Sequence, residues 1–448
     1  MDKVLAIDAG TQSLRACILD RNLIDLERQQ ISYTPRVKSK TWVEIDAELL
    51  WNAFIRACGR LKGAREVEAI SFSTLCPSLV SMDADGNSLG PMILHLDRRS
   101  YRQALWALDR VGEERFLRIA ANLPIPGGIS LTSLLWVKEN EPSIYHRRDV
   151  VFGHGVTFFM KRLTGGFFID PSNASFTGLY NTVAYSDWDD GILADLEIPR
   201  EKLPHLAMSK TVVGELDGKV AASAGLPRGI PVVIGANDTT CAAVGAGVTE
   251  PGKLINSTGT VDNMVLCLDR PLTDKNHLLR THAYPNRWLA MRIVGAGGAS
   301  VEWFRKTFCQ DMSRETFYDD YLAEVLSTSA EPEARFHPYL SGDRHRIQQK
   351  TASFTRLSLG TTREDCLLAL AYGIVSFQAE GLREWRRHVP LDNRIYIVGG
   401  GASEAYTQYK QRFLRDFQFV QLCETALQGA AKLAFETLEG ERGTESRR

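Results

Sequence analysis

The N-terminal stretch reads Val4-Leu-Ala-Ile-Asp8-Ala-Gly10-Thr11-Gln-Ser13-Leu-Arg-Ala-Cys-Ile-Leu19. Two apolar runs flank a short polar turn, which predicts a strand, a tight turn and a second strand, with a third strand over residues 26–32. Gly10 allows the backbone to approach a ligand closely, and the N–H groups and hydroxyls of Thr11 and Ser13 can converge on phosphate oxygens. An ordinary hairpin with polar turn residues is the alternative.

Asp8 stands at the end of the first of these strands. Its carboxylate is a hard oxygen ligand of the kind that suits Mg²⁺. Because that ion gives up its hydration shell reluctantly, we expect the contact to run through water.

The second half of the chain repeats this pattern. Residues 253–257 lead into Thr258-Gly-Thr260 and then into the apolar run 261–267, again strand, turn and strand. We expect the turns 10–13 and 257–260 to face each other across a cleft and to grip a polyphosphate. Two glycine-rich strand ends, within 293–300 and 395–403, each precede a helix, where a phosphate or a flat ring can lie against the backbone.

The stretch Val232-Val-Ile-Gly-Ala-Asn237-Asp238 reads as a buried strand that Gly235 interrupts, followed by a helix of small residues. Asn237 or Asp238 then falls at the helix N-cap. A carboxylate at this place is stabilised by free N–H groups and the helix dipole, so we expect Asp238 to stay ionised at neutral pH and to accept a hydroxyl proton. Simple capping is the alternative.

Composition sets the broad limits. The chain has 448 residues with 44% apolar content, which is enough for two domains. Lys and Arg total 53 against 54 Asp and Glu, so neither a nucleic-acid partner nor a polyanion partner is indicated. The eight cysteines form no CxxC pair, which fits a reducing cytoplasm. No apolar run approaches the length of a membrane span, so we expect no membrane partner.

The first strands are followed by a predicted helix over residues 47–61 and a strand over 67–73. No GxGxxG motif stands at the first strand-to-helix junction, which argues against a dinucleotide-binding Rossmann unit. The elements therefore predict an α/β protein that is not a dinucleotide-binding Rossmann fold.

Five motifs, in this order, resemble the signatures of the FGGY carbohydrate kinases. They are Asp8-Ala-Gly-Thr-Gln-Ser-Leu-Arg15, Gly235-Ala-Asn-Asp238, Ser257-Thr-Gly-Thr260, Gly298 five residues before Trp303, and Gly399-Gly-Gly-Ala402. The resemblance implies the actin-like ATPase fold: two ribonuclease-H-like domains, each with a mixed five-stranded sheet flanked by helices, and a deep cleft between them. It places an N-terminal domain at 1–245 and a C-terminal domain at 246–438. The last ten residues, 439–448, are charged and contain two glycines, so we expect a flexible tail there.

The resemblance also implies an ATP-dependent kinase that transfers the γ-phosphate of ATP to a hydroxyl of a small sugar, ketose, alditol or sugar acid, with Mg²⁺. Asp238 would be the general base, and Asp8 would help to position Mg²⁺. The nucleotide would be bound by residues of both domains, namely Gly10, Thr11, Gln12, Ser13, Arg15, Gly259, Thr260, Gly298, Gly400 and Gly401.

The acceptor loop departs from the best-known members of the family. The loop Thr74-Leu-Cys-Pro-Ser78 stands where xylulose-type kinases have Gln-Met-His-Gly, and the Arg-Glu pair of glycerol kinases falls on Cys76 and Pro77. Neither substrate is therefore indicated. The resemblance implies an acceptor pocket lined by Cys76, Pro77, Ser78, His95, Asp97 and Asp238. His95 replaces the usual Trp, and a structural hydrogen bond is its alternative role.

Two other functional classes stay open. One is an ATPase of the actin or Hsp70 type, and the other is a catalytically weakened sensor that binds a sugar and a nucleotide. Neither the acceptor, nor the role of residues 344–354, nor the oligomeric state follows from the sequence, and a homodimer is one of the options.

Overall fold

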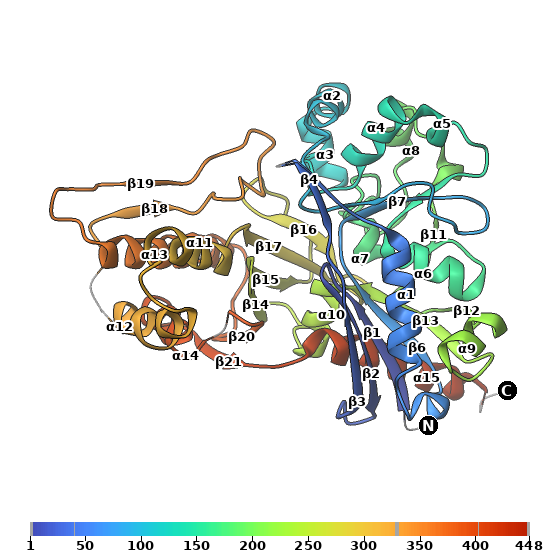
Figure 1. The fold of residues 1–448 in the computed structure, drawn as a ribbon. Helices are drawn as coiled ribbons and strands as arrows, with labels where there is room; N and C mark the ends of the chain where they lie inside the picture. The colour runs from blue at the N-terminus through green and yellow to red at the C-terminus, as the bar shows by residue number, and fades with distance from the viewer. Residues whose placement is uncertain (1–2, 40, 328–330, 402, 446–448) are drawn as a thin grey trace. The chain divides into compact units, whose positions relative to one another are not determined.

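The computed structural model describes residues 3–39, 41–327, 331–401 and 403–445. Its first sheet has the strand order β12-β13-β6-β1-β2-β3 (Figure 1). In it β1 is antiparallel to β2 and parallel to β6, and β2 is antiparallel to β3. The strands are β1 (Lys3–Ala9), β2 (Ser13–Asp20), β3 (Asp25–Ser32), β6 (Ile70–Thr74), β12 (Val212–Glu215) and β13 (Pro231–Asn237).

A second sheet repeats this arrangement, with the order β16-β17-β15-β14-β20-β21. Here β14 is antiparallel to β15 and parallel to β20, as β1 is to β2 and β6. The strands are β14 (Leu254–Thr258), β15 (Asp262–Leu268), β16 (Leu278–Thr281), β17 (Trp288–Val294), β20 (Arg394–Val398) and β21 (Gln418–Gln421). The predicted duplication is confirmed, but the prediction of five strands per sheet is wrong. Two four-residue strands, β12 and β16, add an edge to each sheet and are too short for a clear alternating pattern.

The chain divides into two compact units. Unit 1 comprises Met1–Gly247, Leu279–Trp288 and Glu424–Arg448, and unit 2 comprises Val248–Leu278 and Leu289–Cys423. Unit 1 thus takes its last helix, α15 (Thr425–Glu445), from the end of the chain. This helix continues past residue 439, where the sequence predicted a flexible tail, and residues 446–448 of that tail lie outside the described residues.

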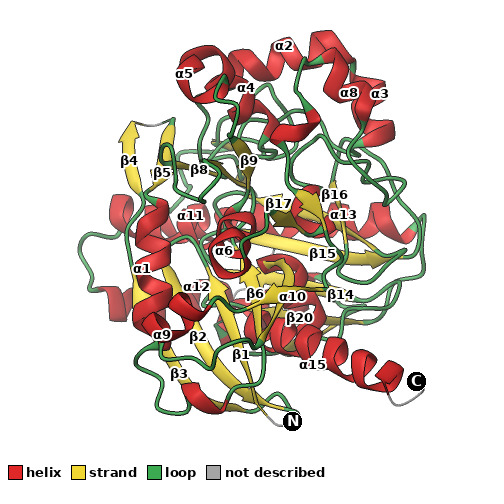
Figure 2. Cartoon of the chain, turned by 90° about the vertical axis from the view of Figure 1, so that its right-hand side faces the viewer, coloured by secondary structure: helices red, strands yellow, loops and turns green. Residues whose placement is uncertain are grey.

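One face of the unit 1 sheet is covered by α15 together with α10 (Asp238–Gly245) (Figure 2). The two helices touch through their backbones. A Cβ on Gly245 would lie 1.9 Å from the Thr425 carbonyl oxygen, and one on Gly429 would lie 1.9 Å from that of Cys241. The small residues of both helices therefore fix the position of the segment that carries Asp238.

The other face is packed by aromatic side chains of α1 (Ala47–Cys58) and α6 (Gly155–Thr164). The ring of Phe72 in β6 lies 6.2 Å from that of Phe54 and 5.2 Å from that of Phe159. All three are fully buried, and each contributes about 1.5–3 kcal/mol through burial of its apolar surface. This packing holds β6, which ends at the predicted acceptor loop.

A smaller sheet of unit 1 has the order β4-β5-β8-β7-β9. Its strands are β4 (Arg36–Ser39), β5 (Trp42–Ile45), β7 (Ser78–Met82), β8 (Met92–Leu94) and β9 (Val151–Gly153). The remaining elements of unit 1 are α2 (Tyr101–Val111), α3 (Glu113–Ile119), α4 (Leu131–Asn140), α5 (Pro142–Tyr145), α7 (Pro171–Ala174), α8 (Asp190–Asp195), α9 (Gly218–Ala224), β10 (Phe168–Ile169) and β11 (His205–Leu206), with short 3₁₀ turns at Ala64–Glu66 and Arg200–Lys202.

Unit 2 surrounds its sheet with helices and one hairpin. These are α11 (Gly298–Phe308), a π-helical turn at Thr316–Tyr321, α12 (Leu322–Ser327), α13 (Arg363–Arg386), α14 (Glu404–Phe413), and the strands β18 (Arg335–His337) and β19 (Ser353–Thr355). Over the described parts of both units, no helix combines the length and the apolar character needed to cross a membrane.

Candidate active site

Asp238 is the first residue of α10, directly after β13. Gly235 makes a bulge in that strand with φ of +74°, and a Cβ there would lie 1.9 Å from the Phe72 carbonyl oxygen, so only glycine fits. The N-cap, which the sequence left between two residues, is Asn237, whose Oδ1 accepts from Thr240 N at 2.9 Å. Asp238 is therefore free of the capping role.

The surroundings of Asp238 raise the pKa of its carboxyl group to about 7. Burial is the largest cause, and the negative charge of Asp8 is the second. Hydrogen bonds from the backbone N–H of Thr239, at 2.6 Å, and from its hydroxyl act in the opposite direction. The prediction of full ionisation at neutral pH is therefore wrong, because desolvation and like charge outweigh the helix terminus.

Asp8 lies in β1 between β2 and β6, and the strand register brings both of its partners opposite to it. Ser73 Oγ donates to Asp8 Oδ1 at 2.6 Å, and Arg15 Nε donates to Oδ2 at 3.1 Å. The side chain is buried, with 6% of its surface exposed. Its carboxylate is thus held in one orientation, and its role in placing Mg²⁺ stays a prediction.

The turn between β1 and β2 is closed by Gly10 N, which donates to Ser13 O at 2.9 Å. Thr11 is half-buried and Gln12 is exposed. Arg15, by contrast, uses its guanidinium within the protein: besides Asp8, it donates to Glu424 Oε2 at 2.7 Å, just before α15. The phosphate contacts of this turn stay a prediction. Three of the five N–H groups of Arg15 already bind carboxylates, so few are left for a phosphate.

The loop between β6 and β7 contains Cys76, Pro77 and Ser78. Cys76 is half-buried, and its Sγ lies 3.4 Å from His154 Nδ1. Burial lowers the pKa of His154 to about 3, so the imidazole is neutral. Burial, and then the charge of Asp238, raises the pKa of the Cys76 thiol well above its usual value, which indicates that Cys76 lies near Asp238.

The neighbouring loop residues Pro77 and Ser78 contact other parts of the protein that hold the loop in place. Pro77 is buried, and Ser78 Oγ donates to Leu75 O at 3.3 Å and accepts from Gly155 N at 3.1 Å. These bonds fix the loop next to α6. A direct contact of Pro77 or Ser78 with an acceptor stays a prediction.

Asp97 is buried and satisfied by neighbouring groups. Its carboxylate accepts from Arg99 Nε at 2.9 Å and from Val43 N at 2.7 Å. His95, two residues earlier, is half-buried, and its carbonyl oxygen accepts from Arg98 Nη1 at 2.9 Å. The structure shows how Asp97 fixes this segment, and the predicted acceptor contacts of both residues stay predictions.

The five predicted nucleotide-binding residues of unit 2 line one pocket of about 1120 Å³, namely Gly259, Thr260, Gly298, Gly400 and Gly401. The sequence did not identify most of the other residues that line it, which include Glu302, Lys306, Arg314, Tyr318 and Tyr406. Glu302 and Lys306 follow the glycine-rich turn with helical spacing. From this spacing the sequence indicates that both side chains lie on one face of α11. It does not indicate that this face lines the pocket.

Backbone hydrogen bonds join the turns of this pocket. Gly298 N donates to Gly259 O at 2.8 Å, and Gly401 N donates to Thr258 O at 3.0 Å. A Cβ on Gly298 would lie 2.5 Å from Gly259 O, whereas a Cβ on Gly400 would meet no atom within 4 Å. Gly298 is therefore needed for the close approach of two turns. Ala402, the last residue of the fifth motif, lies outside the described residues.

A buried ion pair lies below the turn 258–262. Lys410 Nζ in α14 donates to Asp262 Oδ2 at 2.6 Å and also to Asn256 Oδ1. Lys410 is 1% exposed, and Asp262 and Asn256 are fully buried. A buried lysine is rare without a partner, and this one ties α14 to the strands β14 and β15 that carry the turn.

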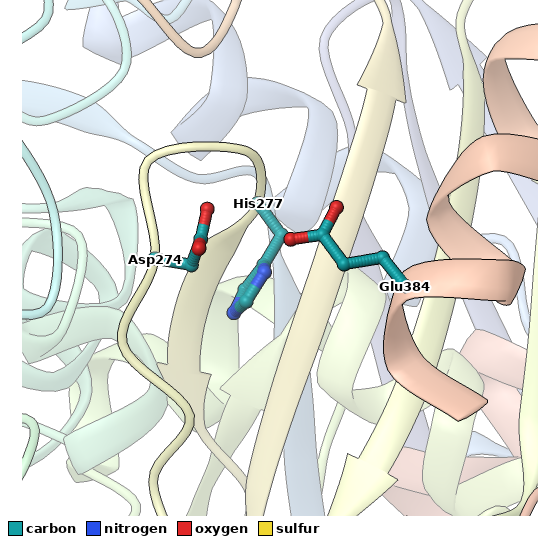
Figure 3. A group of neighbouring side chains, drawn as sticks. All are labelled: Asp274, His277 and Glu384. Carbon is teal, nitrogen blue, oxygen red and sulfur yellow. The ribbon is translucent and has the colours of Figure 1, made fainter. Parts of the chain in front are cut away.

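Asp274, His277 and Glu384 form a second group of possible metal ligands in unit 2 (Figure 3). One ligand atom of each lies within 4.8 Å of the others. His277 Nε2 is 2.7 Å from Leu272 O, and Arg292 Nη1 lies 3.4 Å from Glu384 Oε2. Because Arg292 already compensates one of the two carboxylates, we interpret the group as a network that joins the loop before β16 to α13.

Comparisons with known proteins agree with this geometry. A family model described as the N-terminal domain of the FGGY family of carbohydrate kinases matches residues 3–245. A xylulose kinase of Staphylococcus xylosus is 27% identical over 410 residues, which are 90% of this chain and 83% of the relative.

Solved structures are similar in fold. The ligand-bound xylulose kinase of Lactobacillus acidophilus superposes with a TM-score of 0.88 at 21% identity, covering 98% of this chain and 90% of that one. The gluconate kinase of the same organism gives 0.87 at 21% identity, covering 98% and 89%. At these identities the likeness concerns the fold, which is the actin-like ATPase fold that the sequence predicted.

Proposed function

Because the chain belongs to the FGGY family of carbohydrate kinases and is an ATP-dependent sugar kinase, we propose that Asp238 is its general base. In this role the carboxylate accepts the proton of the acceptor hydroxyl as that oxygen attacks the γ-phosphate of ATP. A base is most effective when its pKa lies near the working pH, and the pKa of about 7 at Asp238 meets this condition. This pKa, together with the fixed position at the start of α10, carries the proposal.

The residues at Asp8 fit a magnesium ion. Mg²⁺ in kinases is typically held by one or two carboxylates together with phosphate oxygens and water. Asp8 lies close enough to Asp238 for its charge to raise the pKa of that carboxyl group, and a cation bound between the phosphates and Asp8 would offset this repulsion. Bound there, Mg²⁺ would neutralise charge on the phosphates, and Asp8 would orient it through water.

We assign the nucleotide to the pocket of unit 2. Thr258, Gly259 and Thr260 line this pocket and lie where phosphate oxygens would bind, and the open space at Gly400 leaves room for the adenosine against the backbone. The β1–β2 turn, with Gly10, Thr11, Gln12 and Ser13, supplies further phosphate contacts from unit 1. Turnover requires that the nucleotide and the acceptor held near Cys76 come together.

The relatives carry the names of kinases for different small carbohydrates, xylulose and gluconate among them. The loop Thr74–Ser78 matches neither the pattern of xylulose-type kinases nor that of glycerol kinases. We therefore propose that the acceptor is a small polyhydroxylated molecule other than xylulose and glycerol. A coupled ADP-release assay over ketoses, alditols and sugar acids tests this. ADP release that depends on a member of these classes supports the proposed acceptor, and release with none of them would refute it.

The variant Asp238→Asn tests the base. We expect it to lower phosphate transfer by about 10²–10⁴-fold while ATP binding, measured by calorimetry, is retained. Asp217→Asn is a matched control, because Asp217 stands at the N-terminus of α9, where it accepts from Lys219 N at 2.8 Å. Unchanged transfer in Asp238→Asn would refute the assignment.

A further inference from the structure

Unit 1 buries an arginine that has no acidic partner. Arg280 in β16 is 1% exposed, and its guanidinium stacks 3.9 Å above the ring of Phe176. Nη1 donates to Leu279 O at 3.1 Å and Nη2 to Gly128 O at 3.2 Å. Nε is buried without an acceptor, and among the described residues no carboxylate lies within 4.0 Å of the group. Carbonyl oxygens and an aromatic ring therefore surround this positive charge, but among the described residues no acidic group pairs with it.

Arg99, a buried arginine of the same unit, has the acidic partners that Arg280 lacks. Its side chain is also buried, and it pairs with Asp97 at 2.7 Å and with Glu44 at 2.9 Å. Burial without such partners lowers the pKa of Arg280 to about 9, which is still high enough for the group to be charged at neutral pH. A buried charge without an ionic partner is unfavourable, so binding of an anion at this place would stabilise it.

The site of Arg280 adjoins the acceptor loop. Gly128, which accepts its hydrogen bond, is two residues from Ser130, whose Oγ lies 2.8 Å from His154 Nε2. His154 in turn contacts Cys76. Cys76 lies close enough to both Asp238 and Arg280 for their charges to act on its thiol, in opposite directions.

A second path of hydrogen bonds leads from Arg280 to the base. The next residue, Thr281, donates through its N–H to Ser175 Oγ, and Ser175 donates to Ser172 O at 2.9 Å. The same Ser172 carbonyl accepts from Asn237 Nδ2 at 3.0 Å, one residue before Asp238. Arg280 and Asp238 are thus fixed relative to each other within unit 1.

A further polar atom beside the acceptor loop lacks a partner. Thr74 Oγ1 is buried without a hydrogen bond, and Thr74 is paired in register with Asn237. Because buried polar groups are normally satisfied, this hydroxyl indicates a polar ligand.

Arg98 adds a second unpaired cation. Its Nη1 donates to His95 O and to Asp97 O, and within the described chain no carboxylate lies in ion-pair range of it. A Cβ on Gly127 would lie 2.0 Å from Arg98 Nη1. Arg98 and Arg280 therefore both lie against the turn Gly127-Gly128.

We propose that the acceptor is an anionic carbohydrate of the sugar-acid class, whose carboxylate pairs with Arg280 while one of its hydroxyls lies at Asp238. The inference rests on the proposed role of Asp238 as the base beside the acceptor. Arg280 keeps Nε and the second N–H of each terminal nitrogen free, and this planar donor set suits a carboxylate. Specificity for such a ligand arises because a neutral sugar would leave the cation unpaired.

The test compares kcat/KM for aldonates, ketoses, alditols and sugar monophosphates of equal chain length. We expect aldonates to be preferred by about a hundred-fold, and Arg280→Gln to abolish that preference by raising the KM for aldonates alone. Arg280→Lys should restore part of it. Arg115→Gln, which removes an arginine paired with Asp195, is the matched control and should leave the preference unchanged. A preference for sugar monophosphates that depends on Arg280 would overturn the assignment to carboxylates.

A binding measurement separates this inference from the proposed role of Asp238 and does not depend on the folding of Arg280→Gln. In the wild-type protein and in Asp238→Asn, an aldonate should raise the melting temperature more than the alditol of equal length. If the aldonate gives this shift but Asp238→Asn transfers phosphate as fast as the wild type, the proposed base fails and the anion site stands. If Asp238→Asn loses transfer and the aldonate gives no shift, the anion site is refuted and the proposed base stands.

Discussion

The nucleotide pocket of unit 2 and the acceptor region of unit 1 are built by different means. The pocket is made largely of backbone: glycine turns are joined by the bonds from Gly298 N to Gly259 O and from Gly401 N to Thr258 O. The acceptor region is made of side chains, with Cys76, Asp238 and Arg280 as its main groups. Backbone sites depend on the absence of Cβ atoms, whereas side-chain sites depend on which groups are present. The two regions should therefore respond differently to substitution.

The largest effect is expected where the backbone pocket is supported from below. Lys410→Met leaves the carboxylate of Asp262 buried without a cation, which should cost about 3–5 kcal/mol of unfolding free energy. Urea unfolding measures this, and the half-buried Lys432→Met in α15 serves as a control. If Lys410→Met lost less than about 1 kcal/mol, the ion pair would not be a support of the pocket.

A smaller effect, specific to the nucleotide, is expected from adding one methyl group. The Cβ of Gly298→Ala would lie 2.5 Å from Gly259 O and must push the two turns apart, so we expect the KM for ATP to rise about a hundred-fold with the KM for the acceptor unchanged. Gly400→Ala is the matched control, since its Cβ meets no atom within 4 Å. Equal effects of the two variants would contradict the backbone description of the pocket.

The same contrast explains what the sequence could predict. The hairpins β1–β2 and β14–β15 and the glycine turns are signalled by consecutive residues, so the duplicated fold and the five pocket residues of unit 2 were predictable. The pKa of Asp238 was not, because its causes are burial and the charge of Asp8, and both arise only on folding. The lack of an acidic partner for Arg280 could not be predicted for the same reason, because ion pairs between residues far apart in the sequence form only on folding.

The smallest effect concerns protonation of the base, and it sharpens the difference between the two regions. Asp238 must be ionised to accept a proton, and its folded pKa of about 7 lies above the ordinary aspartate value of 3.8. The protonated form is therefore dominant below pH 7, and kcat/KM for the acceptor should fall about tenfold for each pH unit below that point, while it levels off above it. The backbone pocket contains no such group among its glycine turns, so the Kd for ADP should change much less over the same range. Asp8→Asn removes the negative charge beside Asp238, so the pKa of Asp238 should fall. The acidic limb of the pH profile of kcat/KM should then move to lower pH in the activity that this variant retains. An acidic limb that stays in place in Asp8→Asn would show that the titration belongs to another group.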